Sequence, residues 1–403
     1  MTRGAQLALC LVLALPAHEI RAAGEADAPA NPANPAQSQA AYDLEIDAPQ
    51  DLRELLLAYL DLARFQSVGD VEPITGAELD RLIAAAPAQA RALLETEGYF
   101  AAAVHAERVA DAQTLPRVRI KVAVGPRVTV AQWTLDALGE LQLLVETNDA
   151  AARITFETLR RNWPLQIGAP FRQSAWTAAK NQTLAQLRAN GYPSATWLDT
   201  DAAIDVAVGS ATLRATLSSG PLFRLGALRI EGLQRYEESS VRNVAEFNAG
   251  APHSEQRLLD FQERLIKTGL FAGASVEVNP DPAQAAAAPV HVRVRELTLQ
   301  QATVGVGYSD RTGQRITFEH THRRPFGFNA IGKNKFELGR DARSWSGDLT
   351  SHTLPGLYRN LVGGAYEVLE VVGEIRTSWR WRAGRAYDSQ RIEGIVFAEW
   401  LGS

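Results

Sequence analysis

The pattern of apolar and polar positions along this chain changes near residue 298. Before that point, segments with helical periodicity alternate with short strand-like runs, and the same succession occurs three times. In each round a helical segment ends at a glycine, which is followed by an aromatic residue or leucine and then by two short strands. These steps are Gly98-Tyr99-Phe100, Gly191-Tyr192-Pro193 and Gly269-Leu270-Phe271. The repetition predicts one small α/β module that is used three times.

The second round shows the order of elements most clearly. Residues 127–135 alternate like a strand, residues 154–163 and 174–190 have helical patterns, and strands are expected near 194–198 and 211–217. The order is therefore β-α-α-β-β, and each unit is large enough to own a small core. The sequence predicts these modules at residues 42–125, 126–219 and 220–297.

The other two rounds follow the same order with weaker patterns. In the first round we expect helices over residues 51–62 and 87–97. In the third we expect a helix over 237–247 and a second one that Ser254 could cap. The tripeptide Gly-Ala-Pro precedes the last helix of rounds two and three, at residues 168–170 and 250–252.

Five glycines mark the boundaries of these elements. Three of them stop a helix, where a residue in the left-handed conformation commonly follows the last turn. The other two stand beside a proline at the end of a module. We interpret all five as turn or hinge positions: Gly98, Gly125, Gly191, Gly220 and Gly269.

A three-stranded sheet with helices on one face leaves an open strand edge. Such an edge is a template on which another strand can add, held by backbone hydrogen bonds. The modules could therefore capture extended peptides, or they could be spacers only.

From Leu299 onward apolar and polar positions alternate in several segments, less cleanly over residues 366–372 and 392–397. Segments of about ten residues with an apolar and a polar face, and with aromatic residues at their ends, are typical of a transmembrane β-barrel. The sequence predicts about seven such strands over residues 298–403, with a soluble antiparallel sheet as the alternative. In the first strand one face carries Ala302, Val304, Val306 and Tyr308, and the other carries Gly305 and Gly307. These two glycines would weaken pairing in a strand that exchanges partners, or form a plain bend.

Seven strands do not make an ordinary bacterial barrel. Single-chain barrels are even-numbered and closed, because an open edge would leave backbone groups unpaired in lipid. We therefore expect residues 298–403 to be the N-terminal part of a barrel, in a C-terminally truncated chain.

The beginning of the chain predicts export from the cytoplasm. Residues 1–22 read as a signal peptide, and residues 23–41 as a flexible linker rich in alanine and proline. The only cysteine, Cys10, falls within the signal, so the mature chain would offer neither disulfides nor thiolate ligands. The formal net charge is −5 and no block of basic residues occurs, which argues against nucleic acid as a partner.

No motif predicts an enzyme, a cofactor site or a metal site. His320, His322 and His352 have some character of metal ligands, but the neighbouring arginines would repel a cation. The tract Arg323 to Phe328 reads as an aromatic turn, and Trp345, Trp379, Trp381 and Trp400 as anchors at a membrane interface. We expect a non-enzymatic protein without cofactor or metal.

Three stretches carry a resemblance to a known family. They are RLGALRIEGLQRY (residues 224–236), LIKTGLFAGASVEV (265–278) and VRVRELTLQQATVGVGYSDRTGQRITFEH (292–320). With the three modules and the alternating region, the chain resembles the BamA-like outer-membrane superfamily that carries polypeptide-transport-associated (POTRA) domains. Three modules, rather than five or two, resemble its TamA type.

This resemblance implies a fold, a location and partners. It implies three α+β POTRA domains in the periplasm, followed by a barrel in the outer-membrane lipid that opens laterally between its first and last strands. Its expected role is outer-membrane protein assembly or autotransporter secretion, with unfolded outer-membrane proteins as clients and a TamB-like inner-membrane protein as partner. The expected gate and client strand is the one that holds Ala302 to Tyr308. The alternatives are a pore of the two-partner-secretion type and a periplasmic scaffold, with an envelope enzyme last.

Overall fold

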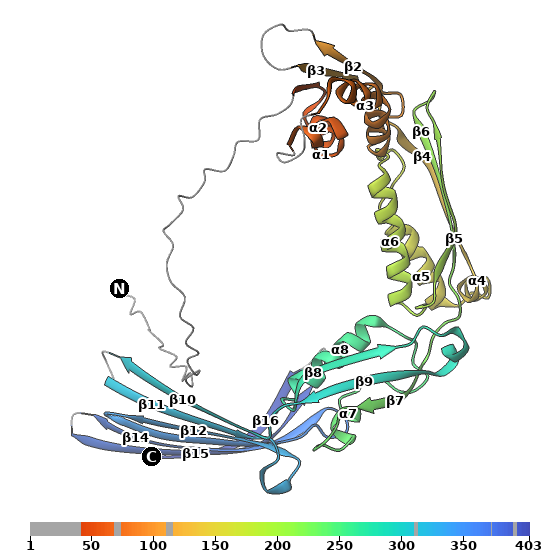
Figure 1. The fold of residues 1–403 in the computed structure, drawn as a ribbon. Coiled ribbons are helices and arrows are strands. Elements are labelled where there is room, and N and C mark those ends of the chain that lie inside the picture. Colours follow the sequence, from red (N-terminus) through yellow and green to blue (C-terminus); the bar gives the residue numbers. More distant parts are fainter. Residues whose placement is uncertain (1–41, 68–73, 110–115, 310–312, 372, 390–392) are drawn as a thin grey trace, which may run out of the picture. The chain divides into compact units, whose positions relative to one another are not determined.

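The structure is a computed structural model that describes residues 42–67, 74–109, 116–309, 313–371, 373–389 and 393–403. The predicted signal peptide and linker lie outside these residues. The described chain falls into two compact units, one ending at Leu222 and the other beginning at Phe223 (Figure 1). Each unit is described by itself below.

The first module contains a three-stranded sheet covered by helices. Strand β3 is central, parallel to β1 and antiparallel to β2. Buried leucines and alanines of the helices pack on Val118 and Ile120 of β3. Its elements are β1 (Asp43–Asp47), α1 (Gln50–Tyr59), α2 (Asp61–Ser67), α3 (Gly76–Thr96), β2 (Ala103–Val109) and β3 (Arg117–Ala123).

Two helix predictions in this module were wrong. The segment predicted as one helix over 51–62 is two helices, because the chain is extended at Leu60. Helix α3 begins at Gly76, not near residue 87, and Pro87 lies inside it. Thr75 caps the helix by accepting a hydrogen bond from the N–H of Glu78. A proline costs a helix one hydrogen bond and some strain, and the apolar face of α3 is buried on both sides of it.

The second module repeats this sheet in the order β4-β6-β5 and adds a short helix, α4, that was not predicted. Trp163 lies at the centre of its core, stacked on Trp133 at 5.5 Å and edge-on to Trp176 at 5.7 Å. Its elements are β4 (Thr129–Leu138), α4 (Glu140–Glu146), α5 (Ala150–Arg161), α6 (Gln173–Ala189), β5 (Thr196–Asp205) and β6 (Ser210–Ser218).

The third module has the sheet order β7-β9-β8. The predicted helix over 237–247 was wrong, because α7 has only four residues. Tertiary contacts hold the segment after it: Asn243 donates to the carbonyl of Thr353, and the carbonyl of Val244 accepts from Arg264. The elements are β7 (Leu225–Glu231), α7 (Ser239–Arg242), α8 (Glu255–Lys267), β8 (Phe271–Val278), the 3-10 turn η1 (Pro282–Ala287) and β9 (Ala288–Glu296).

The recurrent Gly-Ala-Pro segment pairs with the outer edge of the first strand of its own module. In the second module Ala169 accepts from the N–H of Val130 at 2.9 Å, and Gly168 donates back to Val130 at 2.7 Å. In the third, Ala251 and Gly250 bond Leu225 in the same way, at 2.8 and 2.7 Å. The segment therefore covers the beginning of an otherwise open edge, a role that the sequence did not reveal.

After β9 the chain forms one antiparallel sheet of seven strands, as predicted. Each strand pairs with its neighbours in sequence order, and β10 and β16 are the two edges in the described residues. None of the described helices is long and apolar enough to cross a membrane. The strands are β10 (Gln300–Ser309), β11 (Gly313–His322), β12 (Ala330–Gly339), β13 (Ala342–Ser351), β14 (Tyr358–Val371), β15 (Glu374–Asp388) and β16 (Glu393–Gly402).

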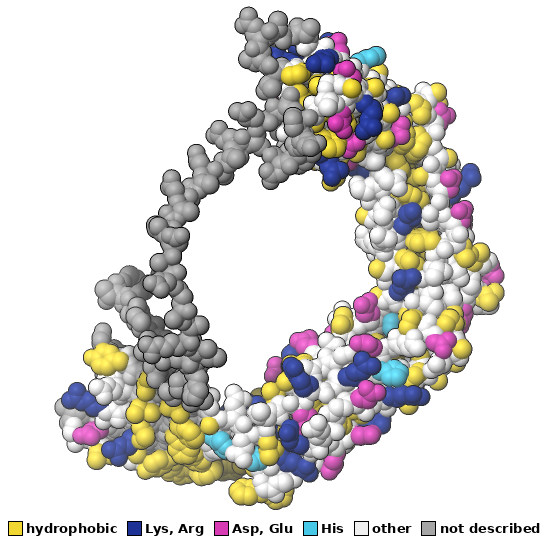
Figure 2. Space-filling model, in the orientation of Figure 1, with side chains coloured by type: hydrophobic (Ala, Val, Ile, Leu, Met, Phe, Trp, Pro, Cys, Tyr) yellow, Lys and Arg dark blue, Asp and Glu magenta, His cyan; other side chains and the backbone are white. Residues whose placement is uncertain are grey.

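The two faces of this sheet differ in chemistry. The register aligns a row of apolar residues across it, and Figure 2 shows hydrophobic side chains gathered over these strands. Glycines make room for the rings: a Cβ at Gly364 would lie 2.7 Å from the ring of Trp381. The opposite face carries ion pairs, such as Arg382 with Asp348 at 2.7 Å. The apolar row consists of Val304, Phe318, Phe336, Trp345, Tyr366 and Trp379.

Candidate functional site: the edge strand β10 and its anchor on module 3

Strand β10 is the edge strand that directly follows module 3. Its only partner in the described sheet is β11, so one side of its backbone faces no strand there. Val304 and Tyr308 keep 69% and 71% of their surface exposed, and Ala302 and Val306 are exposed on the same face. An unpaired edge with apolar side chains is a strand that invites pairing.

The two glycines of β10 differ in their surroundings. A Cβ at Gly305 would lie 2.5 Å from Oγ1 of Thr317, whereas the nearest atom to one at Gly307, Nε of Arg315, is 4.0 Å away. A side chain at position 305 would therefore require the Thr317 hydroxyl to move, and this hydroxyl now donates weakly to the carbonyl of Gly305 at 3.4 Å. At position 307 the packing alone does not require glycine.

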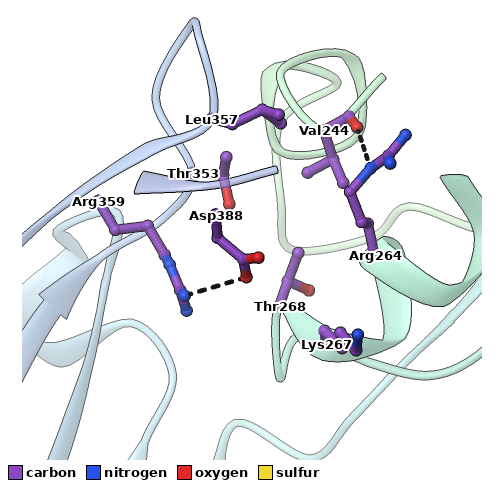
Figure 3. Close-up of a pocket in the computed structure, with 8 residues that line it drawn as sticks. All are labelled: Val244, Arg264, Lys267, Thr268, Thr353, Leu357, Arg359 and Asp388. Atoms are coloured by element: carbon purple, nitrogen blue, oxygen red, sulfur yellow. Dashed lines mark hydrogen bonds and ion pairs between the residues drawn. The ribbon is translucent and has the colours of Figure 1, made fainter. Parts of the chain in front are cut away.

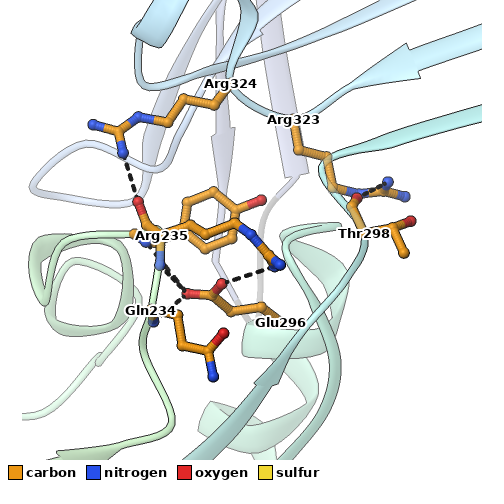
Figure 4. A network of polar contacts seen from close by, with 7 residues as sticks. Gln234, Arg235, Glu296, Thr298, Arg323 and Arg324 are labelled. Atoms are coloured by element: carbon orange, nitrogen blue, oxygen red, sulfur yellow. Dashed lines mark hydrogen bonds and ion pairs between the residues drawn. The ribbon is translucent and has the colours of Figure 1, made fainter.

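The end of β9, which leads into β10, is held within module 3 by the buried carboxylate of Glu296. Oε1 of Glu296 accepts hydrogen bonds from the N–H groups of Gln234, Arg235 and Tyr236 at 2.8, 2.9 and 3.3 Å (Figure 4). The side chain of Glu296 is only 4% exposed. Burial by itself would raise the pKa of Glu296, but these backbone hydrogen bonds and the Arg235 guanidinium outweigh it and lower the pKa below 4.5.

Arg323, in the turn after β11, forms the second fixation. Its side chain donates to the carbonyls of Gly269 and Thr298 at 2.8 Å each and to Oε1 of Gln301 at 3.1 Å. The residue is 7% exposed. Arg324 beside it donates to the carbonyl of Arg235 at 2.6 Å. The turn between β11 and β12 is thus bonded to the end of α8. It is also bonded to the β9–β10 connection and to the loop after β7, as Figure 4 shows.

His352, after β13, completes this junction. Its Nε2 donates to the carbonyl of Arg323 at 3.1 Å, and its ring stands edge-on to Tyr236 at 5.5 Å. The residue is 8% exposed, and this burial lowers the pKa of His352 below 6.5. The neutral imidazole is therefore the form that fits the junction.

All five glycines proposed as turn or hinge positions have positive φ, between 65° and 107°. Two of them also contact the element that follows their module. The carbonyl of Gly98 accepts from the N–H of Val128 in module 2, and the carbonyl of Gly269 accepts from Arg323 in the turn after β11. The glycine step that ends a module's last helix therefore forms a joint in both cases.

The three histidines considered as metal ligands do not converge. The rings of His320 and His322 are 6.3 Å apart on one face of β11, while His352 is buried against Tyr236. Among the described residues no group of three or more His, Cys, Asp or Glu side chains could hold a metal ion.

No family model and no curated protein sequence matches this chain. Solved structures do. A crystal structure of BamA from Haemophilus ducreyi lacking POTRA domains 1–3 matches with a TM-score of 0.50 and 15% identity, over 64% of this chain and 47% of that one. The chain therefore has the fold of a POTRA-and-barrel protein. It spans about half the length of that relative, and in its described residues the seven-stranded sheet is not closed.

Two further matches have TM-scores below 0.5, and we base no argument on them. CdiB from Acinetobacter baumannii is 15% identical over 68% of this chain and 53% of its own, with a TM-score of 0.38. POTRA domains 3–5 of BamA from Haemophilus influenzae are 18% identical over 64% and 96%, with a TM-score of 0.34.

The sequence did not reveal the junction residues. The tract from Arg323 to Phe328 was interpreted as an aromatic turn, and a turn does join β11 and β12 there. Arg323 and Arg324 also bond module 3. The neighbouring sequence gives no sign of these bonds, because the partners lie up to 89 residues away. Glu296 ends an alternating strand and was not singled out.

Proposed function

We propose that this chain takes part in outer-membrane protein assembly or autotransporter secretion, with its modules in the periplasm and its seven strands in outer-membrane lipid. The observation that carries the proposal is the free edge of β10. This strand directly follows an anchored POTRA-like module, and its own apolar face is exposed. A client strand would pair with this edge through backbone hydrogen bonds, which are tolerant of sequence. The similarity in fold to BamA supports the same role.

The work in this proposal is templating of β-strands, driven by backbone pairing and burial of apolar side chains. It requires no enzymatic step. In a complete barrel, β10 would form one lip of a lateral gate, opposite the last strand. The number of modules favours the TamA type, which would bring a TamB-like inner-membrane protein as partner.

We propose β8 as the module edge that accepts extended peptides. On its free side, the N–H of Val276 is bonded only by the side chain of Gln262, at 3.3 Å, which a peptide carbonyl could displace. The corresponding edge of module 2, β5, carries Asp199, Asp201 and Asp205, and charges on an edge strand discourage pairing. The glycines serve as turns and hinges, with Gly220 close to the division of the two units at Leu222.

Disulfide mapping between β10 and a client tests the templating role. The only cysteine is Cys10, so a Cys10→Ser background allows single cysteines to be placed at will. We expect Val306→Cys to cross-link to a client's terminal strand at one register only. Ile316→Cys is the matched control, because it shares the exposed face but lies on β11, which has partners on both sides.

Equal cross-linking from both positions, or none from Val306→Cys, would overturn the proposal. Single-channel conductance without register-specific cross-links would instead favour a secretion pore.

A further inference from the structure

The polar face of the seven-stranded sheet has a group of exceptions to its alternation. Ile331, Leu361 and Ile395 occupy positions on β12, β14 and β16 whose neighbours two residues away are mostly polar, charged or glycine. All three line one cavity of about 410 Å³ at the end of the sheet nearest module 3. Ile395 is 52% exposed there, whereas Leu361 is 9% exposed and Ile331 packs against the core of module 3. Phe397 and Leu401 are further apolar residues on this face of β16, outside the cavity. The exposed apolar side chain of Ile395 beside several cations offers a ligand both apolar and charged contacts.

The register explains why these residues meet. Ile331 pairs with Thr350, and Thr350 pairs with Leu361, so the three form a row across β12, β13 and β14. The neighbouring row on the same face contains Thr321, Lys333 and Asp348, and continues to Arg382. The C-terminal end of α8, with Lys267 and Thr268, forms the wall on the side of module 3.

The cavity has an excess of positive charge. Three of its five cations are paired: Arg382 with Asp348 at 2.7 Å, Arg359 with Asp388 at 3.4 Å and Lys267 with Glu263 at 2.9 Å. Figure 3 shows the adjoining pocket, where Arg359 turns to Asp388 beside Lys267 and Thr268. The remaining two cations are Lys333 and Arg323.

These two have no carboxylate partner among the described residues. Lys333 is exposed to the cavity and forms no hydrogen bond there with the described chain. Arg323 is 7% exposed, and the three acceptors that it contacts are neutral oxygens. A charge removed from water is costly without an opposite charge nearby, so an anion in this cavity would be stabilised.

We propose that this cavity binds an extended peptide segment that carries both acidic and aliphatic side chains. The carboxylates contact Lys333 and are attracted by the charge of the buried Arg323, and an aliphatic side chain contacts the exposed Ile395. Inorganic phosphate would use the cations alone and leave Ile395 in water. A lipid would have to bring its acyl chains to the face opposite the apolar one. That the segment belongs to a client rests on the proposed function, whereas the binding chemistry does not.

Fluorescence anisotropy with the full chain in a neutral detergent tests this. The probe is a decapeptide that alternates aspartate with leucine or valine and carries a neutral fluorophore, compared with the same peptide with asparagine for aspartate. We expect tighter binding of the acidic peptide, weakened by salt because exposed charges are screened. Lys333→Glu should weaken it about five- to tenfold, as charge reversal at a binding surface does.

Two matched controls lie on the same strands and faces, outside the cavity. Lys335→Glu changes a lysine that pairs with Glu319 and Glu337, and it should alter affinity less than about twofold. Ile395→Asn should weaken binding about threefold through lost apolar contact, whereas Leu401→Asn, further along β16, should leave it unchanged.

Equal affinity for the acidic and neutral peptides, or equal effects of Lys333→Glu and Lys335→Glu, would overturn the proposal. Two results together would also overturn it: inorganic phosphate or phosphatidylglycerol micelles displace the acidic peptide, and Ile395→Asn leaves the affinity for that peptide unchanged. Failure of the β10 cross-links alone would leave peptide binding here intact, so the two proposals fail separately.

Discussion

Two joints of this molecule use the same glycine step but stabilise it differently. Between modules 1 and 2, Glu97 accepts a hydrogen bond from Arg127 at 3.3 Å and forms an ion pair with Arg172 at 3.1 Å, and Phe100 packs on Phe171. Where module 3 meets the strands, Arg323 and His352 contact the module, and Glu296 holds the end of β9 beside them; all three side chains are at least nine-tenths buried.

The difference concerns how the polar groups are satisfied. The first joint is closed by backbone packing and by ion pairs that water reaches, which contribute little to stability. The second is closed by buried groups whose hydrogen bonds cannot be replaced by water if they break. The joint nearest the proposed gate should therefore be the more specific one, and the more sensitive to single substitutions.

The largest effect should follow removal of the buried arginine. Arg323→Ala leaves the carbonyls of Gly269 and Thr298 without this donor, at a cost of about 3–4 kcal/mol in the opening free energy of the junction. Arg172→Ala, whose side chain is 48% exposed, should cost less than about 1 kcal/mol at the first joint. Hydrogen exchange of the Arg323 and Val128 amides reports the two joints separately. Similar losses at both would refute the contrast.

A second prediction, for the glycine of each joint, assigns the larger cost of substitution to the joint between modules 1 and 2. An alanine Cβ at Gly98 would lie 2.3 Å from the carbonyl oxygen of Phe171, so backbone must shift, at a cost of about 3 kcal/mol. At Gly269 the nearest atom would be Cδ1 of Ile331 at 3.6 Å, and Gly269→Ala should cost only the strain of positive φ, about 1–2 kcal/mol. Exchange of the Val128 amide measures the first cost, and exchange of the Leu297 amide measures the second. A larger loss for Gly269→Ala would show that packing does not dominate the first joint.

The third prediction uses pH. Burial lowers the pKa of His352 below the value of 6.5 that it has when unfolded, so the unfolded form binds more protons. Stability of the junction is then fully present above pH 6.5 and is lost as the pH falls through the folded pKa. Glu296, whose pKa is below 4.5, adds a further loss in stronger acid with the same sign.

We expect exchange protection of the Arg323 amide to decrease between pH 6.5 and 5, and the decrease to be smaller in His352→Gln. Arg323, Arg324, Tyr236 and Glu237 surround His352 and stay unchanged in this variant. His253 in module 3 is also buried with a lowered pKa, so His253→Gln is the control for acid effects elsewhere in the module. An unchanged pH profile in His352→Gln would exclude this histidine as the source.

The sequence predicted the parts of the fold that rest on periodicity. Alternation gave the seven strands, and the glycine steps gave three modules, because both patterns arise from local geometry. It did not predict the length of α7, where Asn243 and Val244 contact residues far away in the chain, or the start of α3, where burial outweighs Pro87. The junction was missed for the same reason: Glu296 and Arg323 have ordinary neighbours, and their roles come from partners about 25 to 60 residues away.

The smallest effect should come from the exposed half of the Glu296 cluster. Arg235 pairs with Glu296 at 3.3 Å, but its side chain is 45% exposed, and the three backbone N–H groups remain when it is replaced. Arg235→Met should therefore cost no more than about 0.5–1 kcal/mol. Glu296→Gln keeps one acceptor oxygen but loses the charge, and should cost about 2 kcal/mol. Exchange of the Tyr236 amide compares the two variants. If Arg235→Met proved as costly as Arg323→Ala, solvent-reached ion pairs would hold this joint as well, and the two joints would differ in geometry alone.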